Sequence, residues 1–270
     1  MPRLDDPAIR EGAADLGAFA AAIVARTSRL RVGFSVLLLA LHHPIRLAEE
    51  IATLDVLSEG RIDLGISRGS NARYLSAYGL AGQPDRSSFE DSIQLMVRAW
   101  ADGQIELGDA PTASVSVEPK PVQRPHPPIY IGTYTEATAA AAARAGHRLI
   151  CHGITKPQTM ARLIRAFRDA GGDPTEVPLG RFVYVAQTDA DARRELWPTL
   201  LKLTARLRSI ARRRAGLIDE STLEPETFYR QMVIAGAPQT CAEQIEALYQ
   251  TYGSRYLNAL SAFFGFLPRR

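Results

Sequence analysis

The sequence predicts an α/β protein in which helices cover a mostly parallel β-sheet. Short apolar stretches alternate with longer amphipathic ones along most of the chain, which is typical of repeated strand–helix–strand units. Several short stretches are continuous apolar runs, as expected for strands buried on both faces. Because 270 residues with 46% hydrophobic composition can bury one large core, we expect a single domain over residues 1–270.

The first elements establish the pattern. Residues 13–27 are rich in alanine and carry apolar residues at helical spacing, which predicts a helix. Residues 29–40, "RLRVGFSVLLLA", predict a continuous buried strand. The next helix is expected from Pro44 to Gly60, since proline suits a first helical turn and glycine commonly ends a helix. Residues 61–67, "RIDLGIS", predict the second strand.

The alternation continues to the end of the chain. A helix is expected over residues 87–103, followed by a small hairpin excursion near residues 104–118, where apolar and polar residues alternate. Pro198 is expected to break or bend a long helix. The later strands are expected to begin near Ile129, Leu149, Phe182 and Tyr256, and the later helices to cover residues 135–146, 156–172, 189–214 and 238–253.

The six strands are expected to be parallel neighbours in one curved sheet, because strands joined through helices pair in parallel. A (β/α)₈ barrel needs eight strands, whereas a doubly wound open sheet can be built from six. Periodicity alone does not separate these two architectures. In both of them, ligands bind at the carboxyl ends of the strands.

Composition argues against several classes of protein. Lys and Arg number 32 and Asp and Glu 29, so the net charge of +3 gives no nucleic-acid signature. Cys151 and Cys241 form no CxxC motif, which favours a reduced protein over one with a single disulfide. No apolar run reaches the roughly 18–20 residues that span a bilayer, and the polar first residues do not resemble a signal peptide. We expect a cytoplasmic protein without a membrane or nucleic-acid partner.

Arg68 is the first candidate site residue, because it follows the strand at residues 61–67 directly. Its neighbours Gly69 and Ser70 are small enough to let the backbone approach a ligand. A planar guanidinium binds phosphate through two parallel hydrogen bonds. The alternative is an arginine that pairs with a surface carboxylate.

A second candidate is the segment "GTYTEAT" between a strand and an alanine-rich helix. The first turn of a helix offers unpaired N–H groups and the positive end of the helix dipole, which together favour phosphate. Thr133, Tyr134, Thr135 and Thr138 add hydroxyl groups. The alternative is an ordinary helix cap at Thr133 or Thr135.

The histidines give weaker signals. His42 and His43 lie on a strand-to-helix turn, which raises the alternatives of a metal site or a general base. Adjacent side chains diverge, however, and a histidine before proline is typical of a helix start. His126, His147 and His152 show no ligand spacing with carboxylates, so we expect no metal site.

The segment "ARTSRLRVGFSVLLLALHHPIRLAEEIATLDVLSEGRIDLGISRGSNARYLSAYG" resembles the bacterial luciferase-like flavin-dependent monooxygenase family. The similarity continues through "PKPVQRPHPPIYIG" and "GAPQTCAEQI" and covers most of residues 25–264. It implies a (β/α)₈ TIM barrel that holds reduced flavin mononucleotide (FMN) at the carboxyl ends of its strands. It also implies insertion of an oxygen atom from O₂ into a small organic substrate, with reduced flavin supplied by a separate reductase.

The resemblance assigns cofactor-binding roles to both candidate sites. Arg68 falls where the family places an arginine on the flavin phosphate. A second phosphate-binding loop is implied at Thr133, Tyr134, Thr135 and Thr138. Ser35 and Val36 fall near a peptide bond, often cis in the family, that backs the isoalloxazine ring.

This sequence also departs from the family pattern. The family normally begins with a strand, a helix and a second strand that leads to catalytic residues, whereas only residues 1–13 precede the first helix here. We therefore expect an incomplete barrel of about six strands, and the catalytic residues stay unassigned, since His42 and His43 do not match the family's histidine.

Unpaired strand edges in such a barrel favour a homodimer. Two alternatives stay open: a shortened, non-catalytic flavin-binding or interaction protein, and an oxidoreductase of the same superfamily that uses a deazaflavin coenzyme. The arginine after "LGIS" favours FMN over deazaflavin.

Overall fold

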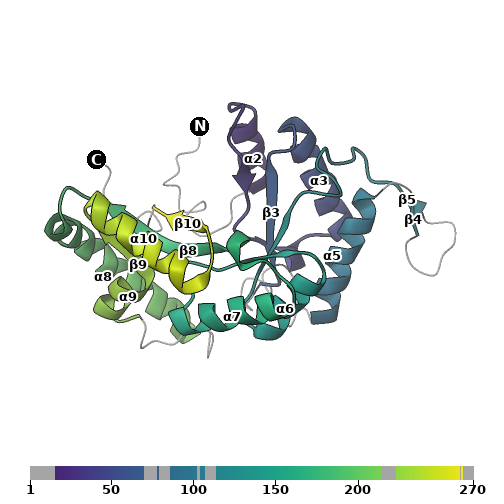
Figure 1. Cartoon of the computed structure of the whole chain (residues 1–270). Helices are drawn as coiled ribbons and strands as arrows, with labels where there is room; N and C mark the ends of the chain where they lie inside the picture. Colours follow the sequence, from purple (N-terminus) through teal and green to yellow (C-terminus); the bar gives the residue numbers. More distant parts are fainter. Residues whose placement is uncertain are drawn as a thin grey trace. The chain divides into compact units, whose positions relative to one another are not determined.

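A computed structural model describes residues 16–69, 78, 86–101, 104–106, 114–213, 223–261 and 263. Parallel strands alternate with helices along the chain, which confirms the α/β class (Figure 1). The chain divides into two compact units, of which one contains residues 14–132 and the other residues 133–270. Ser70 and the middle of the predicted hairpin excursion lie outside the described residues. A single barrel domain stays a prediction.

The unit of residues 14–132 is built on strand β3, Ile62–Ser67, whose Ile62, Leu64 and Ile66 are fully buried. It pairs in parallel with β6, Ile129–Gly132, and with two very short strands, β1, Val32–Gly33, and β2, Leu37–Leu38. The predicted continuous strand over residues 29–40 is therefore wrong. Its two halves both pair with β3, but they are separated by an interruption.

The interruption is a β-bulge. Gly33 is in register with Asp63, and Leu37 with Ile66, so three residues on one strand oppose two on the other. Gly65 makes this possible, because a Cβ atom there would overlap the carbonyl oxygen of Phe34. The peptide bond between Ser35 and Val36, within the bulge, is cis.

The helices of this unit begin and end close to the predicted residues. They are α2, Leu16–Val24, α3, Pro44–Leu57, and α5, Arg86–Trp100, with a short 3₁₀ turn η1 at Leu39–Leu41. Trp100 is fully buried and donates a hydrogen bond from Nε1 to the carbonyl oxygen of Ala48, 2.9 Å away, which links α5 to α3. Within the predicted hairpin excursion, strand β4, Ile105–Glu106, pairs in antiparallel fashion with β5, Ser114–Val115.

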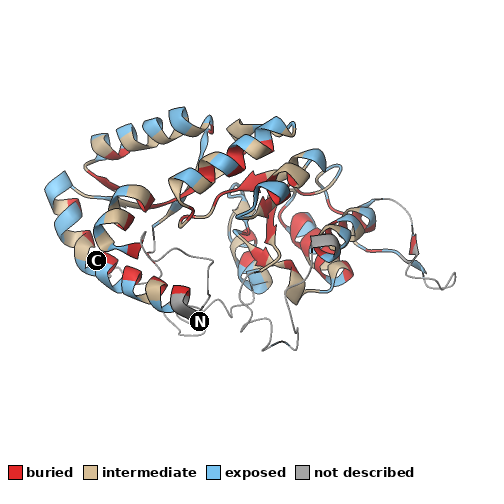
Figure 2. Cartoon of the chain, turned by 90° about the horizontal axis from the view of Figure 1, so that it is seen from below, coloured by how far each residue is buried: buried red, intermediate tan, exposed pale blue. Residues whose placement is uncertain are grey.

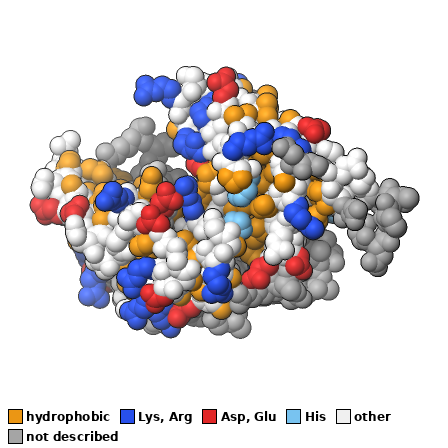
Figure 3. Space-filling view, turned by 45° about the vertical axis from the view of Figure 1, so that its right-hand side comes forward, with side chains coloured by type: hydrophobic (Ala, Val, Ile, Leu, Met, Phe, Trp, Pro, Cys, Tyr) orange, Lys and Arg blue, Asp and Glu red, His pale blue; other side chains and the backbone are white. Residues whose placement is uncertain are grey.

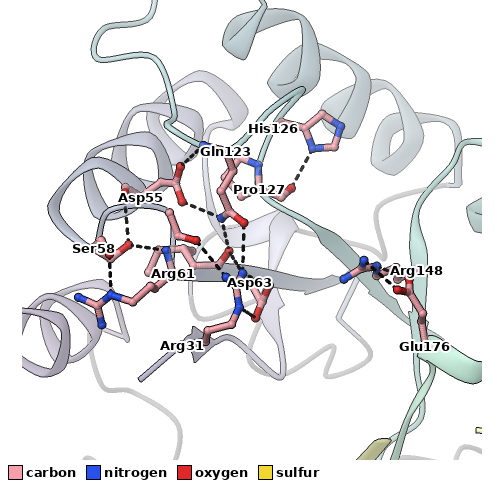
Figure 4. Close-up of polar contacts among 12 residues, drawn as sticks. Arg31, Asp55, Ser58, Arg61, Asp63, Gln123, His126, Pro127, Arg148 and Glu176 are labelled. Carbon is pink, nitrogen blue, oxygen red and sulfur yellow. Dashed lines mark hydrogen bonds and ion pairs between the residues drawn. The ribbon is translucent and has the colours of Figure 1, made fainter. Parts of the chain in front are cut away.

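A polar network joins helix α3 to the amino ends of β1 and β3 (Figure 4). The fully buried Asp55 accepts hydrogen bonds from the backbone N–H and the Nε2 of Gln123, at 2.9 and 2.7 Å. Gln123 also donates to the carbonyl oxygen of Ile62 and accepts from Arg31. Arg31 in turn donates two hydrogen bonds to the carboxylate of Asp63, from Nε at 3.1 Å and from Nη2 at 2.7 Å. This contact raises the pKa of Arg31.

The unit of residues 133–270 contains parallel strands β7, Arg148–Ile150, β8, Pro178–Val185, β9, Val233–Gly236, and β10, Tyr256–Leu260. The last three pair in the order β10-β8-β9. Cys151, just after β7, bridges to Leu179 on β8. The predicted strands pair in parallel, and β10 is a neighbour of β8. The expectation that all six lie in one curved sheet is not met, because the strands are assigned to two sheets, with the parallel bridge of Cys151 to Leu179 outside both.

Figure 2 colours the ribbon by burial and shows buried residues on both strands and helices. In this unit, Phe182 belongs to a cluster of buried side chains and lies against the rings of Phe228 and Phe263. Pro198 lies inside the continuous helix α8, so a break there is contradicted, whereas the alternative of a bend stays a prediction. Cys151 and Cys241 form no disulfide and are both buried.

The helices of this unit are α6, Glu136–Arg144, α7, Pro157–Asp169, α8, Asp189–Arg213, α9, Pro225–Met232, and α10, Pro238–Tyr252, with a 3₁₀ turn η2 at Pro174–Glu176.

The described surface is mixed in charge. On the face shown in Figure 3, acidic and basic side chains are interspersed with apolar ones, in keeping with the small net charge. No described helix is long and apolar enough to cross a membrane.

The bulge gives a test with a matched control. We expect Gly65→Ala to lower the free energy of unfolding by about 3 kcal/mol, because the new methyl group displaces the backbone of Phe34. Gly33→Ala on the neighbouring strand should change it by less than about 1 kcal/mol, since its Cβ would meet nothing closer than 3.6 Å. Urea unfolding of both variants checks this, and equal effects would contradict the assigned role of Gly65.

The polar network gives a second test. Asp55→Ala leaves two donors of Gln123 without their acceptor, so we expect a loss of about 2–5 kcal/mol of unfolding free energy. Glu50→Gln, on the exposed side of the same helix, is the control and should change it by less than about 0.5 kcal/mol. Thermal or urea unfolding measures the difference, and a small effect of Asp55→Ala would show that Gln123 finds other partners.

Candidate cofactor site

Arg68 directly follows the carboxyl end of β3, and it is partly buried. Gly69 after it has a φ of 86°, a conformation that glycine adopts readily and other residues avoid. Among the described residues, no hydrogen bond or ion pair engages the Arg68 guanidinium. The alternative of a paired surface arginine therefore has no support within the described part of the chain.

The bulge beside this strand end supplies an apolar surface. The side chain of Val36 lies over two glycines on neighbouring strands, and its Cγ1 is 3.2 and 3.3 Å from where Cβ atoms of Gly65 and Gly132 would be. Side chains at either glycine would push Val36 away. Ser35 is exposed at the same place, so the backbone of the bulge is accessible from outside.

In the unit of residues 133–270, the residues before helix α6 bring several hydroxyl groups together. Thr135 Oγ1 donates to Thr138 Oγ1 at 2.9 Å, and the backbone N–H of Thr135 donates to Thr133 Oγ1 at 3.1 Å. Tyr134 is 45% exposed beside them. This arrangement creates a polar cluster at the amino end of a nine-residue helix.

The amino end of helix α6 tests the alternative that Thr133 or Thr135 is an ordinary helix cap. Thr135 is the N-cap residue, yet its side chain makes no capping bond to the first turn, and it contacts Thr138 instead. The Thr135 hydroxyl therefore does not act as an ordinary helix cap. A helix amino terminus with adjacent hydroxyl donors can hold a phosphate group.

Each phosphate candidate follows the carboxyl end of a parallel strand, Arg68 after β3 and the threonine cluster after β6. They belong to different units of the chain, and the structure describes each within its own unit. The cofactor roles of Arg68, Ser35, Val36 and the threonine cluster stay predictions. The cis peptide bond that the resemblance implied near Ser35 and Val36 is present.

The histidine turn has a structural role. His42 ends the turn η1, and His43 is the N-cap residue of α3, where its carbonyl oxygen accepts from the N–H of Leu47 at 2.9 Å. The His43 side chain makes no capping bond. No cluster of three or more metal-binding side chains occurs within the described ranges.

Sequence reasoning considered His152 only as a metal ligand and did not note its position at a strand end. His152 follows β7 and Cys151, and burial lowers the pKa of its imidazole. Burial also raises the pKa of the Cys151 thiol to about 12, so this thiol stays protonated at neutral pH. Only the position of His152 directly after a short apolar strand could have marked it in the sequence.

Comparison with known proteins places these features in a family. The model of the luciferase-like monooxygenases matches residues 8–255. The chain is 36% identical over 162 residues to protein y4wF of Sinorhizobium fredii, covering 57% of this chain and 45% of that protein. It is 24% identical over 247 residues to limonene 1,2-monooxygenase of Rhodococcus erythropolis, covering 87% and 63%. The chain thus spans less than two thirds of the length of either relative.

Solved structures agree with this fold. Monooxygenase RslO1 from Streptomyces bottropensis has a TM-score of 0.73 and 27% identity, over 92% of this chain and 75% of that one. The oxygenating constituent of 3,6-diketocamphane monooxygenase from Pseudomonas putida, in complex with FMN, has a TM-score of 0.76 and 20% identity, over 93% and 78%.

The second likeness shows the fold alone, whereas the family model spans most of the chain. The predicted luciferase-like α/β barrel class is therefore confirmed, together with a length shorter than that of the relatives. The chain belongs to the luciferase-like monooxygenase family.

Proposed function

We propose that the chain is a flavin-dependent monooxygenase that binds FMN and transfers an oxygen atom from O₂ to a small organic substrate. The observation that carries this proposal is the amino end of helix α6, where hydroxyl groups of three threonines gather and the N-cap side chain leaves the first turn uncapped. A doubly charged phosphate matches such a site. The relatives named as monooxygenases support the class of reaction.

Each candidate offers a group that suits one part of FMN. Arg68 supplies a guanidinium that grips a phosphate through two bonds, and the threonine cluster supplies neutral donors. In the bulge at Ser35 and Val36, the Val36 side chain beside Gly65 offers an apolar contact for a planar ring system. Reduced flavin, when bound, supplies the electrons that activate O₂. In this proposal, the role of the protein's residues is to bind the phosphate and the ring.

A deazaflavin coenzyme is the alternative within the same superfamily. A coenzyme F420-dependent tetrahydromethanopterin reductase from Methanopyrus kandleri has a TM-score of 0.67, but with 16% identity this likeness shows the fold alone. The position of Arg68 directly after β3 favours FMN over a deazaflavin coenzyme. A non-catalytic flavin-binding protein is the remaining alternative, and the titration below distinguishes it from a protein that binds no flavin.

We also propose two partners and a location. A separate reductase would supply the reduced flavin. A second copy of the chain would cover apolar side chains exposed on α2 and α3, such as Phe19 and Leu57, which are 50% and 61% exposed. We place the protein in the cytoplasm, where reduced flavin is available.

Replacing Arg68 tests the phosphate assignment. A charge-assisted hydrogen bond contributes roughly 1.5–3 kcal/mol, so we expect Arg68→Ala to weaken FMN binding about tenfold to a hundredfold. Riboflavin lacks the phosphate and should bind the variant and the original protein almost equally. Fluorescence titration of both proteins with both flavins provides the measurement.

The control is Arg46→Ala, since Arg46 is an exposed arginine on α3 that pairs with Glu49 and Glu50. It should leave both affinities unchanged. An equal loss of riboflavin and FMN affinity in Arg68→Ala would make Arg68 a structural residue. If the original protein binds neither flavin, FMN dependence is wrong. If it binds FMN but oxidises no substrate when reduced flavin is supplied, the non-catalytic alternative is favoured.

A further inference from the structure

Arg181 lies within strand β8 and is almost completely enclosed by the protein, with 3% of its surface exposed. Its Nη2 atom is 3.7 Å from Sδ of Met160 on helix α7, so the side chain extends from the sheet to that helix. An arginine with so little exposure is unusual, because a charge that leaves water loses its hydration and needs a compensating partner.

The guanidinium of Arg181 uses few of its hydrogen-bond donors. Of the five N–H groups that an arginine carries, one on Nη1 donates to the carbonyl oxygen of Gly180 at 2.7 Å and one on Nη2 to the Met160 sulfur, a weak acceptor. Arg61, by comparison, donates from each of its three guanidinium nitrogens to backbone carbonyl oxygens. No described carboxylate forms an ion pair with Arg181.

The positive charge of Arg181 persists in this position. Burial lowers the pKa of Arg181, but a guanidinium stays protonated throughout the physiological pH range. The acidic groups that act on it electrostatically are those of Tyr252 and Cys151. Burial raises the pKa of both, so neither carries a negative charge at neutral pH. The interior therefore holds a cation for which the described part of the chain supplies no anion.

We propose that Arg181 binds a small monovalent inorganic anion, such as chloride, in the interior beside β8 and helix α7. One negative charge neutralises one guanidinium, whereas a doubly charged anion would leave a net charge buried. The donors of Arg181 that bond to no described residue supply directed N–H groups for such an ion. Protein interiors are close-packed, which favours a small ion over an extended one.

This site has a consequence for stability that does not depend on the proposed function. The unfolded chain lacks the arrangement around Arg181, so the anion binds the folded protein alone and shifts the folding equilibrium towards it. We therefore expect the protein to be more stable in chloride than in a salt of a large organic anion.

The first test measures stability against chloride concentration. Urea unfolding of the full chain is followed while sodium chloride replaces sodium gluconate at constant ionic strength. Beyond the dissociation constant, the folding equilibrium constant should rise about tenfold for each tenfold rise in chloride, as expected for one site. If the original protein gains no more from chloride than the neutral variant below, the proposal is wrong.

Arg181→Met supplies the neutral comparison, since methionine is long and apolar but uncharged. It should show no such dependence on chloride. At the lowest chloride concentration it should be at least as stable as the original protein, because the uncompensated buried charge is gone. Arg162→Met, at an exposed position on α7, should keep the full dependence. A structural role for Arg181 predicts instead a loss of stability in Arg181→Met that is equal at every chloride concentration, which would overturn the proposal.

Diffraction gives a direct readout that needs no variant to fold. Crystals of the original protein, grown without halide and soaked in sodium bromide, should show an anomalous peak within hydrogen-bond reach of the Arg181 guanidinium. That peak, together with chloride-dependent stability, would establish the site. A water molecule without an anomalous peak, or a carboxylate from elsewhere in the chain or from a second copy, would overturn the proposal.

Discussion

The approach of the Phe34 carbonyl group to Gly65 determines the chain path in the unit of residues 14–132. Any side chain at Gly65 would occupy the space of that oxygen, so the extra residue of the bulge could not be accommodated. Without the bulge, Leu37 would not come into register with Ile66, and the chain would enter the turn before helix α3 from a different place. The exposure of Ser35 and the position of Val36 depend on the same contact.

The polar residues of this unit fall into two groups with different physical roles. At the amino ends of β1 and β3, Arg31, Asp55 and Gln123 satisfy one another's hydrogen bonds almost completely, as expected of a structural network. At the carboxyl end, Arg68 has no such partner among the described residues. A cation that a fold leaves unpaired at a ligand-binding edge is better placed to bind an anion than to stabilise the chain.

Much of the architecture could be predicted because the signals were local. Pro44 and the apolar face of α3 identified that helix, and the run at residues 61–67 identified β3. The bulge could not be predicted, since it depends on a glycine about 30 residues away in sequence. Strand β9, Val233–Gly236, was missed because it follows helix α9 without a break and is only four residues long. The order β10-β8-β9 is likewise a matter of tertiary pairing.

The candidate cofactor-binding residues, like the helices and strands, could be proposed only where the signal was local in sequence. Position after a strand identified Arg68 and the threonine cluster, because carboxyl ends of parallel strands collect ligands whatever the sequence around them. His152 satisfied the same criterion, but the hydrogen bond that its ring accepts from the backbone N–H of Ile154 depends on how the chain turns after β7. The sequence contains no pattern for such a contact.

The segment of residues 119–128, "PKPVQRPHPP", is ordered without forming a helix or a strand, and Asp55 reaches it through Gln123. Half of its residues are prolines, which have few conformations even in an unfolded chain. Little entropy is therefore lost when the segment adopts its native path. The buried carboxylate of Asp55, which accepts a hydrogen bond from the backbone N–H of Gln123, helps to fix the path of the segment into β6. A more flexible loop would need more contacts to be held in the same path.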